Sequence, residues 1–361
     1  MTIYINGQCL ERMLTGVERY TLSVLKAMDR LLVEEAAYAD VDAVLLLPPA
    51  GHCDVQLKRI GIQKIGRGKG HFWEQIELPF YCRGKFLLSL HSVAPLMQQR
   101  QLLVMHDAKV VHREKSDASE LARRWYVFLG RVLGRRLPRI IAISNYAAQD
   151  IHEGYGIPYE KIKVILNGRY DLSNVSEDVD ILRRHDLHPH KFILAVGGGS
   201  TKNNILTAYA VEQLRDNEMV FVVAGHSPES VRAKLNSCSK TRCIGRVTDE
   251  ELAALYKNAL CLAFPSFVEG FGAPPLEAMS VGCPVIASTC EAVPEICGDA
   301  ALYVDCHSVD SMREKIEQVI YNSELRMHQI ERGYENLRRF DWTRTAKAIL
   351  DEAISVMKLY Y

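Results

Sequence analysis

The sequence predicts an α/β protein made of two doubly wound units, each a parallel β-sheet covered by helices. The chain has 361 residues, which fits two domains of roughly 100–200 residues. Short apolar runs alternate with longer amphipathic stretches along the whole sequence, a pattern typical of strand–helix–strand repeats. The runs are continuously apolar, as expected for strands buried on both faces of a sheet.

The apolar runs place the strands. In the first half of the chain we expect strands at residues 3–5, 41–47, 86–90, 102–105, 140–143 and 162–165. In the second half we expect them at 192–196, 220–224, 243–244, 260–264, 285–287 and 301–304. Amphipathic spacing predicts helices between them, for example at 17–32, 249–258, 308–320 and 342–359.

A polar segment, residues 167–191, lacks a strand signal and precedes a new strand at 192. We therefore predict an N-terminal domain over 1–170 and a C-terminal domain over 188–340. A helix over 341–361 follows, and one placement of it crosses back onto the N-terminal domain. Ligands of doubly wound sheets bind beyond the carboxyl ends of the strands, so two such units facing each other are expected to form a deep cleft.

Composition excludes several classes of protein. Lys plus Arg and Asp plus Glu both number 44, so no global attraction to nucleic acid is expected. No apolar run approaches the ~18 residues of a membrane span, and the first residues form a strand-like pattern without a signal-peptide core. The ten cysteines form no Cys-x-x-Cys pair, which favours free thiols in the cytoplasm over disulfides or zinc.

Two candidate loops follow strands of the first half. Gly16 comes directly before the helix at 17–32, where backbone N–H groups can approach a phosphate; a plain turn is the alternative. His106 and Asp107 follow the strand at 102–105. That position suits a cleft-facing pair, with a surface turn as the alternative.

Three glycines, 197–199, follow the first strand of the second half and precede Lys202. The spacing is not Gly-x-Gly-x-x-Gly, because Lys202 stands at the third glycine position counted from Gly197, and it is not a P-loop. Glycines such as Gly198 allow close backbone approach, and an ammonium group offsets charge, so the loop suits a diphosphate. A strand-to-helix turn with a solvated lysine is the alternative.

The segment 264–288, FPSFVEGFGAPPLEAMSVGCPVIAS, is the most informative. Glu269 precedes Gly270, Phe271 and Gly272, and we expect Glu277 in the first turn of a helix starting near Pro274 and Pro275. The carboxylates can accept hydrogen bonds from sugar hydroxyls, and the glycine N–H groups can hold phosphate oxygens. A capping box is the alternative for the glutamates, and core packing is the alternative to sugar stacking for Phe271.

Seven segments spread over nearly the whole chain carry a family resemblance. They are the Glu269-x7-Glu277 segment, TGVERYT at 15–21, FWEQIELP at 72–79, MHDA at 105–108, IAISNYAAQDI at 141–151, VILNGRYD at 164–171 and CIGRVTDEELAALYKNAL at 243–260. With these the chain resembles the retaining glycosyltransferases of family 4, which have the GT-B architecture of two facing Rossmann-like domains. Within that family it is similar to the mannosyltransferase-B-like branch, which builds bacterial surface polysaccharides such as the O-antigen of lipopolysaccharide.

The resemblance implies roles for residues of the second half. Glu277 would bind the ribose of a nucleotide, and Glu269 with the Gly270–Gly272 backbone would hold the donor sugar and phosphate. Lys202 would neutralise the leaving diphosphate. The backbone of Gly245, Arg246 and Val247 would lie against the base.

In the first half the resemblance implies that Gly16 lies beside the phosphates and that His106 touches the donor sugar at the reacting centre. One departure is visible: the family usually carries a second basic residue after the first glycine, where this chain has Gly198. Lys202 is then the main cation of its loop, with help expected from Arg246. No metal or other cofactor is implied, because Lys202 and helix N-termini supply positive potential.

The implied reaction is the transfer of a hexose from a nucleotide diphosphate sugar to a growing saccharide or lipid-linked acceptor. The diphosphate leaves, and the acceptor hydroxyl attacks from the same face through positioning and electrostatic stabilisation. GDP-mannose is the first candidate donor, and UDP- or dTDP-sugars are alternatives. A GT-B-like epimerase or dehydrogenase and a non-catalytic sugar-binding protein remain as other classes; the missing dinucleotide fingerprint disfavours the dehydrogenase.

Residues 121–139, LARRWYVFLGRVLGRRLPR, combine arginines with large aromatic side chains. A basic amphipathic helix can lie on an anionic membrane surface, which would suit a lipid-anchored acceptor. Peripheral contact with the inner membrane is therefore one expectation. The alternative is a helix packed on the core with a solvated basic face.

Overall fold

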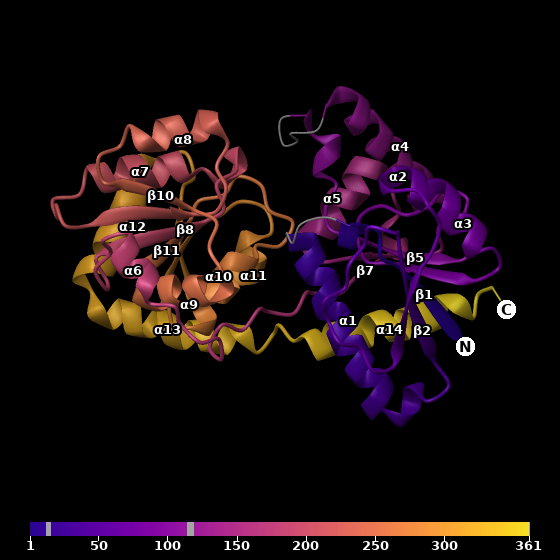
Figure 1. Ribbon diagram of the computed structural model, residues 1–361. Coiled ribbons are helices and arrows are strands. Elements are labelled where there is room, and N and C mark those ends of the chain that lie inside the picture. Colours follow the sequence, from indigo (N-terminus) through magenta and orange to yellow (C-terminus); the bar gives the residue numbers. More distant parts are fainter. Residues whose placement is uncertain (12–15, 114–118, 361) are drawn as a thin grey trace. The chain divides into compact units, whose positions relative to one another are not determined.

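The computed structural model describes residues 1–11, 16–113 and 119–360 (Figure 1). The chain folds into two compact units. Unit 1 comprises Met1–Gly168 and Asp341–Tyr361, and unit 2 comprises Arg169–Phe340. The C-terminal segment thus belongs to the N-terminal unit, so the chain crosses from one unit to the other twice.

The sheet of unit 1 has seven parallel strands in the order β3-β2-β1-β4-β5-β6-β7. The strands are β1 (Thr2–Asn6), β2 (Asp42–Leu47), β3 (Ile60–Lys64), β4 (Phe86–Ser89), β5 (Gln101–Met105), β6 (Ile140–Ala142) and β7 (Ile162–Val164). The order changes direction between β1 and β4, which makes their carboxyl ends the switch point where such sheets bind ligands.

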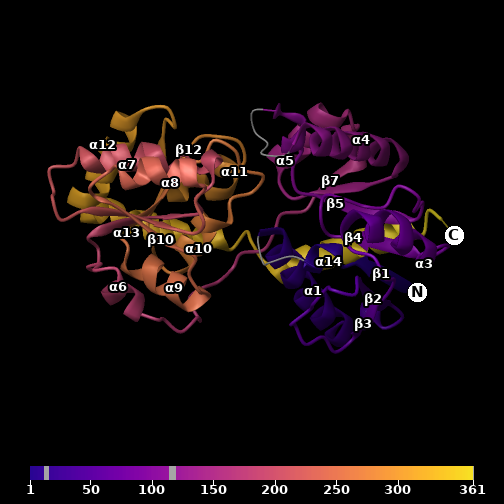
Figure 2. The same cartoon turned by 45° about the horizontal axis from the view of Figure 1, so that its top comes forward.

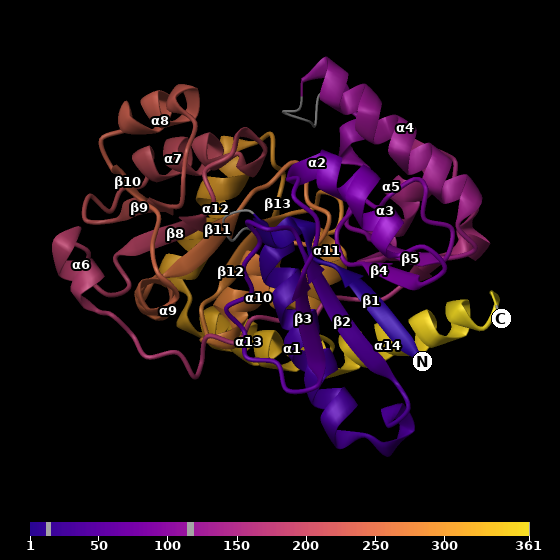
Figure 3. The same cartoon turned by 45° about the vertical axis from the view of Figure 1, so that its right-hand side comes forward.

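Helices cover both faces of this sheet, because right-handed crossovers put connections that run in opposite directions on opposite faces. α1 (Gly16–Glu34) packs against the C-terminal α14 (Trp342–Met357) on one face. The other face carries α4 (Glu120–Arg136) and α5 (Asn145–Tyr155), as Figure 2 shows. On this side also lies a helical segment made of α2 (Gly70–Phe72), the π-helical turn η3 (Trp73–Glu77) and α3 (Leu78–Tyr81), seen beside α4 in Figure 3. Short 3-10 turns are η1 (Gln8–Glu11), η2 (Ala36–Tyr38), η4 (Lys109–Val111) and η6 (Tyr159–Lys161).

Unit 2 repeats this topology with six parallel strands in the order β10-β9-β8-β11-β12-β13. The strands are β8 (Phe192–Val196), β9 (Val220–Ala224), β10 (Thr241–Gly245), β11 (Cys261–Phe264), β12 (Val285–Ser288) and β13 (Ala301–Val304). Its switch point lies between β8 and β11.

One face of this second sheet carries α7 (Asn204–Glu212), α8 (Glu229–Asn236) and α12 (Val309–Tyr321), visible together in Figure 2. The remaining helices are α6 (Asp180–Arg184), α9 (Asp249–Asn258), α10 (Ala273–Ser280), α11 (Val293–Cys297) and α13 (Ser323–Leu337), with 3-10 turns η7 (Ser200–Lys202) and η8 (Gly298–Ala300). α6 packs against α9, and α10 against α13.

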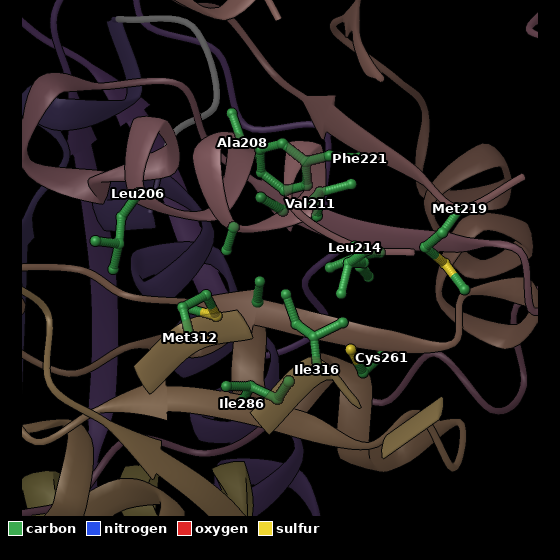
Figure 4. Close-up of a cluster of buried hydrophobic side chains, with 14 of the residues drawn as sticks. Leu206, Ala208, Val211, Leu214, Met219, Phe221, Cys261, Ile286, Met312 and Ile316 are labelled. Carbon is green, nitrogen blue, oxygen red and sulfur yellow. The ribbon is translucent and has the colours of Figure 1, made fainter. Parts of the chain in front are cut away.

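The core of unit 2 beneath α7 and α12 is built from continuous apolar runs. Phe221 of β9 is fully buried, and its ring lies beside Ala208 and Val211 of α7 (Figure 4). Met312 and Ile316 of α12 are equally buried in this cluster. Burying a side chain of this size stabilises the fold by about 1.5–3 kcal/mol, and the cluster fixes the strands whose ends carry the candidate site.

The predicted fold class, two Rossmann-like units with parallel sheets, is confirmed. Every predicted strand is present within one or two residues, and the helix over Asp249–Asn258 has the predicted bounds. β3 was not predicted, because four of its five residues are exposed at the sheet edge and its sequence IGIQK lacks a continuous apolar run. All ten cysteines are free, and seven of them are buried. Among the described residues, no helix is both long and apolar enough to span a membrane.

Candidate functional site

The switch point of unit 2 brings two predicted residues into contact. Lys202 lies in the turn after β8 and Glu269 in the loop after β11, and their Nζ and Oε1 atoms are 2.5 Å apart. Their side chains are 23% and 13% exposed, so the ion pair is only partly removed from water. The Lys202 ammonium also lies 5.0 Å from the centre of the Phe264 ring, a cation–π distance.

The two loops are tied to each other through their backbones. The N–H of Phe267 donates to the carbonyl of Thr201 at 2.8 Å. Asn203 adopts the left-handed conformation at φ 56°, and its amide donates to the carbonyls of Pro265 and Cys306. Asparagine tolerates this conformation better than most residues, so the site is set by a rigid turn.

Glu269 is held from a third strand end. Its backbone N–H donates to the Glu291 carboxylate at 2.5 Å, and Glu291 follows β12 with φ at 54°. A non-glycine residue in this region carries strain, which such sites retain where the surroundings enforce it. Glu291 was not predicted, although the strand-end rule that selected His106 would also have selected it.

Glu277 lies on α10 and is 6% exposed. Its Oε2 accepts a hydrogen bond from the Tyr256 hydroxyl at 3.0 Å. The expectation that Glu277 lies in the first turn is wrong: α10 begins at Ala273, and its first turn holds no acidic residue. Pro274 and Pro275 occupy the start of the helix, as predicted, and the helix begins one residue before Pro274. Gly272 precedes it with φ at 95°. Tyr256 was also missed; it lies on the fully buried face of α9.

Two predicted residues of unit 2 have packing roles in the structure. Gly198 is buried, and a Cβ there would lie 2.0 Å from Ser227 Oγ and 2.6 Å from the His226 carbonyl. Phe271 is 7% exposed, and its ring packs edge-on against Phe340 at 5.8 Å between centroids. Core packing of Phe271, one of the two expectations, is therefore what the side chain does here.

The end of β10 presents Gly245, Arg246 and Val247. Gly245 has φ at 77°, and nothing lies within 4 Å of a Cβ added to it. Arg246 is exposed and Val247 is partly exposed. Gly270 is also partly exposed, so the backbone of both loops is accessible to a ligand.

Gly16 and His106 belong to unit 1. Gly16 is the first residue of α1 and is exposed, with nothing within 4 Å of an added Cβ. Residues 12–15, which include Thr15 of the TGVERYT segment, lie outside the described residues.

His106 follows β5 and is held in one orientation. Its ring Nε2 lies 3.0 Å from the Leu90 carbonyl, which can only accept, so Nε2 carries the proton and Nδ1 the lone pair. Its backbone N–H donates to Ser92 Oγ at 3.0 Å, and Tyr20 packs edge-on against the ring. Burial, reinforced by the nearby His91, lowers the pKa of His106 to about 4, so the ring is neutral near pH 7.

Within the part of the chain that the structure describes, no group of three or more His, Cys, Asp or Glu residues is arranged to hold a metal ion. The site residues of unit 2 instead offer the ammonium of Lys202 and the carboxylates of Glu269, Glu277 and Glu291, and unit 1 offers the neutral imidazole of His106. Groups of these kinds can bind hydroxyl groups and offset the charge of a phosphate.

Solved structures share this fold. A glycosyltransferase from Rickettsia africae aligns over 99% of this chain and 98% of its own, with a TM-score of 0.73 at 17% identity. The class is therefore GT-B.

Sequence comparison gives the family. Residues 14–169 match the family described as Glycosyltransferase Family 4, and residues 182–336 match Glycosyl transferases group 1. Each half of the chain thus matches a glycosyltransferase family model, which confirms the resemblance seen in the sequence.

Two relatives show where in the family the chain lies. The O-antigen chain mannosyltransferase B of Escherichia coli is 29% identical over 216 residues, which cover 56% of this chain and 57% of that protein. The O-antigen chain mannosyltransferase RfbU of Salmonella typhimurium is 24% identical over 84% of this chain and 87% of its own. The first match thus spans little more than half of the relative's length.

Proposed function

We propose that this protein is a hexosyltransferase that moves a sugar from a nucleotide diphosphate donor onto a growing surface-polysaccharide acceptor. The observation that carries the proposal is the Lys202–Glu269 pair at the switch point of unit 2. A cation and a hydrogen-bond acceptor there match the two parts of such a donor, its diphosphate and its sugar hydroxyls.

Each residue has a part in the proposed reaction. Lys202 stabilises the charge that develops on the leaving diphosphate, and Glu269 accepts hydrogen bonds from the donor sugar. Glu277, oriented by Tyr256, binds the ribose hydroxyls. The neutral Nδ1 of His106 accepts a hydrogen bond from the sugar near the reacting carbon.

We further propose that the anomeric configuration is retained and that the reaction needs no metal ion. Lys202 and helix N-termini supply the positive potential. Proton NMR of the product anomer checks whether the configuration is retained. Activity measured with excess chelator checks whether the reaction needs a metal ion. An inverted anomer or loss of activity with chelator would contradict the corresponding statement.

GDP-mannose is the proposed donor. Its support is the naming of both relatives as O-antigen mannosyltransferases. UDP- and dTDP-sugars are the alternatives, because the residues near the base, Gly245–Val247, offer mainly backbone groups.

The test is a thermal-shift series with GDP, UDP, dTDP and ADP, followed by donor hydrolysis assays. A ligand that binds only the folded state raises the melting temperature, and we expect GDP to give the largest shift. Release of GDP from GDP-mannose distinguishes a transferase from a sugar-binding protein, which releases none, and from an epimerase, which changes the sugar while it stays attached. No release from any donor overturns the proposal.

We also propose that unit 1 contacts an anionic membrane surface. On α4 the apolar side chains of Leu121, Trp125 and Phe128 are exposed by 82%, 38% and 51%. Arg131, Arg135 and Arg136 are exposed on the same helix. Apolar and cationic groups side by side favour binding to an anionic lipid interface.

A second exposed apolar row lies next to α4. Phe72, Ile76 and Phe80 are 60%, 41% and 69% exposed at helical spacing, and His71 of this segment hydrogen-bonds Tyr126 of α4 at 2.8 Å (Figure 3). The R131Q/R135Q/R136Q variant should lose binding to vesicles with anionic lipid. A matched variant with three exposed arginines of unit 2, R183Q/R232Q/R332Q, should keep it; equal binding by both would contradict the membrane contact.

A further inference from the structure

The FWEQIELP segment of unit 1 has no part in the proposed reaction, yet it contains buried side chains that are hydrogen-bonded. Its Trp73 is fully buried, and the indole N–H donates to the Ile65 carbonyl at 2.8 Å. The next residues, Glu74 and Gln75, lie in the π-helical turn η3. Such turns are rare in proteins, and those that occur are often found at functional sites.

Glu74 is fully buried at the switch point of the unit 1 sheet. Its Oε1 accepts hydrogen bonds from Asn6 Nδ2 and His91 Nε2, both at 3.0 Å. Asn6 also donates to Ser89 Oγ at 3.2 Å. Asn6 and Ser89 are the last residues of β1 and β4, so the carboxylate joins the two strands on either side of the switch point.

The charges in this cluster reinforce each other. Burial alone would raise the pKa of Glu74, but the His71 ring, whose Nδ1 lies 3.6 Å from Oε2, and the hydrogen bonds from His91 and Asn6 lower it to about 2. Burial alone would lower the pKa of His91, but the adjacent Cys9 and Glu74 raise it to about 10. Glu74 and His91 therefore form a buried ion pair near pH 7.

The segment that carries His91 holds His106 on both sides. Leu90 supplies the carbonyl that accepts from the His106 ring, and Ser92 supplies the hydroxyl that accepts from the His106 backbone. Gln75 secures the next part of the same connection, because its amide donates to the Ala94 carbonyl and accepts from the Leu96 N–H, both at 3.1 Å. Glu74 and Gln75, adjacent residues of one π-helical turn, thus hydrogen-bond to residues 91, 94 and 96 of the connection that follows β4.

We propose that Glu74 is a positioning residue: through its ion pair with His91 it fixes residues 90–92 and so holds His106 with the proton on Nε2 and the lone pair on Nδ1. Its consequence for catalysis rests on the proposed function of His106. Removing one partner of a buried pair leaves the other charge uncompensated, so residues 90–92 shift and the Leu90 carbonyl no longer selects the tautomer. The charged groups that act on His106 are His91 from the β4 end and Glu18 from α1.

The test is E74Q, which keeps the shape of the side chain and removes its charge. The first readout is the ¹⁵N spectrum of histidine-labelled protein at pH 7, with the His106 signals assigned by comparison with H106Q. We expect a single Nε2–H tautomer of His106 in the unchanged protein and a mixture in E74Q. The second readout is kinetic: kcat should fall by up to about 100-fold, the cost of a misplacement of about 1 Å. Nucleotide affinity, which the proposed function assigns to unit 2, should stay unchanged.

H152Q is the matched control. His152 is also a partly buried histidine of unit 1 whose ring bonds a backbone carbonyl, that of Ile157, and it lies on α5 away from residues 90–96. It should change neither readout. If E74Q does not fold, as judged by circular dichroism, H91Q is measured in the same two ways and should give the same result.

The outcomes separate the two proposals. An unchanged His106 tautomer in a folded E74Q or H91Q protein overturns the positioning role, whatever the activity. A mixed tautomer with unchanged kcat overturns the catalytic part of this inference together with the role of His106 in the proposed function. A mixed tautomer with reduced kcat and intact nucleotide binding supports both.

Discussion

The two units have the same sheet topology but differ in how exposed the carboxylate at the switch point is. Both sheets change direction between their first and fourth strands, and in both a carboxylate bridges the two sides. In unit 1 this carboxylate is Glu74, fully buried and bonded to Asn6 and His91. In unit 2 it is Glu269, whose side chain is 13% exposed and paired with a Lys202 that is 23% exposed.

The difference in exposure between the two ion pairs indicates which one has a structural role and which one can bind a ligand. A buried ion pair has lost its water, and it is tolerated only when further hydrogen bonds replace that water; Asn6 provides one for Glu74. A partly hydrated pair can exchange its partner for a ligand group at smaller cost. We therefore assign the buried cluster to holding other residues and the hydrated pair to holding the donor.

The largest effect is expected at the hydrated pair. K202A removes the cation assigned to the leaving diphosphate, and losing one such stabilising group costs about 10²- to 10³-fold in kcat. The measurement is steady-state release of nucleotide diphosphate from the preferred donor. The melting temperature should change little, because a partly exposed pair contributes about 0–1 kcal/mol to stability.

K257A is the control for that variant. Lys257 is 29% exposed and pairs with Glu177 at 2.8 Å, so it matches Lys202 in burial and pairing but lies at the end of α9. Its kcat should be unchanged. Equal kcat in both variants would contradict the assignment of Lys202.

Glu277 gives the next largest effect. E277A removes the carboxylate assigned to the ribose hydroxyls, and losing hydrogen bonds to a charged group costs about 1.5–3 kcal/mol, or roughly 10- to 100-fold in nucleotide Kd. Calorimetric titration with the nucleotide that gives the largest thermal shift measures it. Y256F, which removes only the hydroxyl that orients Glu277, should weaken binding by a smaller factor.

The control is E212A, because Glu212 is a carboxylate of unit 2 that accepts hydrogen bonds from the Lys240 backbone and from Ser239. It lies at the C-terminal end of α7, whereas the Lys202 loop precedes the N-terminal end. Its nucleotide affinity should match that of the unchanged protein. If E277A also binds nucleotide normally, the ribose assignment is wrong.

The fold could be predicted from the sequence because its signal is local. Runs such as Phe192–Val196 are apolar throughout, and a strand buried on both faces needs nothing else. β3 could not be found this way, since an edge strand with exposed side chains leaves no such signal. Its place follows from pairing with β2, which is a tertiary interaction.

The site was predictable in part for the same reason. His106 directly follows a strand, and Lys202 and Glu269 lie in the loops that follow β8 and β11, so chain position selects them. Tyr256 and Glu74 act through contacts with residues 21 and 17 positions away, which no local pattern encodes. The motif containing Glu74 was recognised, but its role depends on the pairing of β1 with β4.

A pair of glycine substitutions tests close packing against open access. G198A forces a Cβ within 2.0 Å of Ser227 Oγ, and overpacking of this kind costs about 1–3 kcal/mol. G16A meets nothing within 4 Å and should leave the free energy of unfolding unchanged or raise it by less than about 1 kcal/mol. Urea unfolding of the two variants measures both; a G198A protein as stable as G16A would show that the 226–227 turn yields freely.

The last expected effect concerns the buried pair of unit 1 and appears only as the pH is changed. The pKa of His91 is raised from the ordinary 6.5 to about 10, so the native state holds a proton that the unfolded chain releases. This stabilisation is fully present below pH 6.5 and is lost as the pH rises toward 10, with a slope of at most about 1.4 kcal/mol per pH unit. His106, whose pKa is lowered to about 4, adds no slope there because it is neutral in both states. The buried cysteines, whose pKa values are raised in the folded protein, add a similar slope to every variant above about pH 8. Urea unfolding at pH 6.5, 7 and 7.5 should therefore show a decline in the unchanged protein and in H152Q that is weaker in H91Q; an equal decline in H91Q would mean that the Glu74–His91 pair is not charged in the native state.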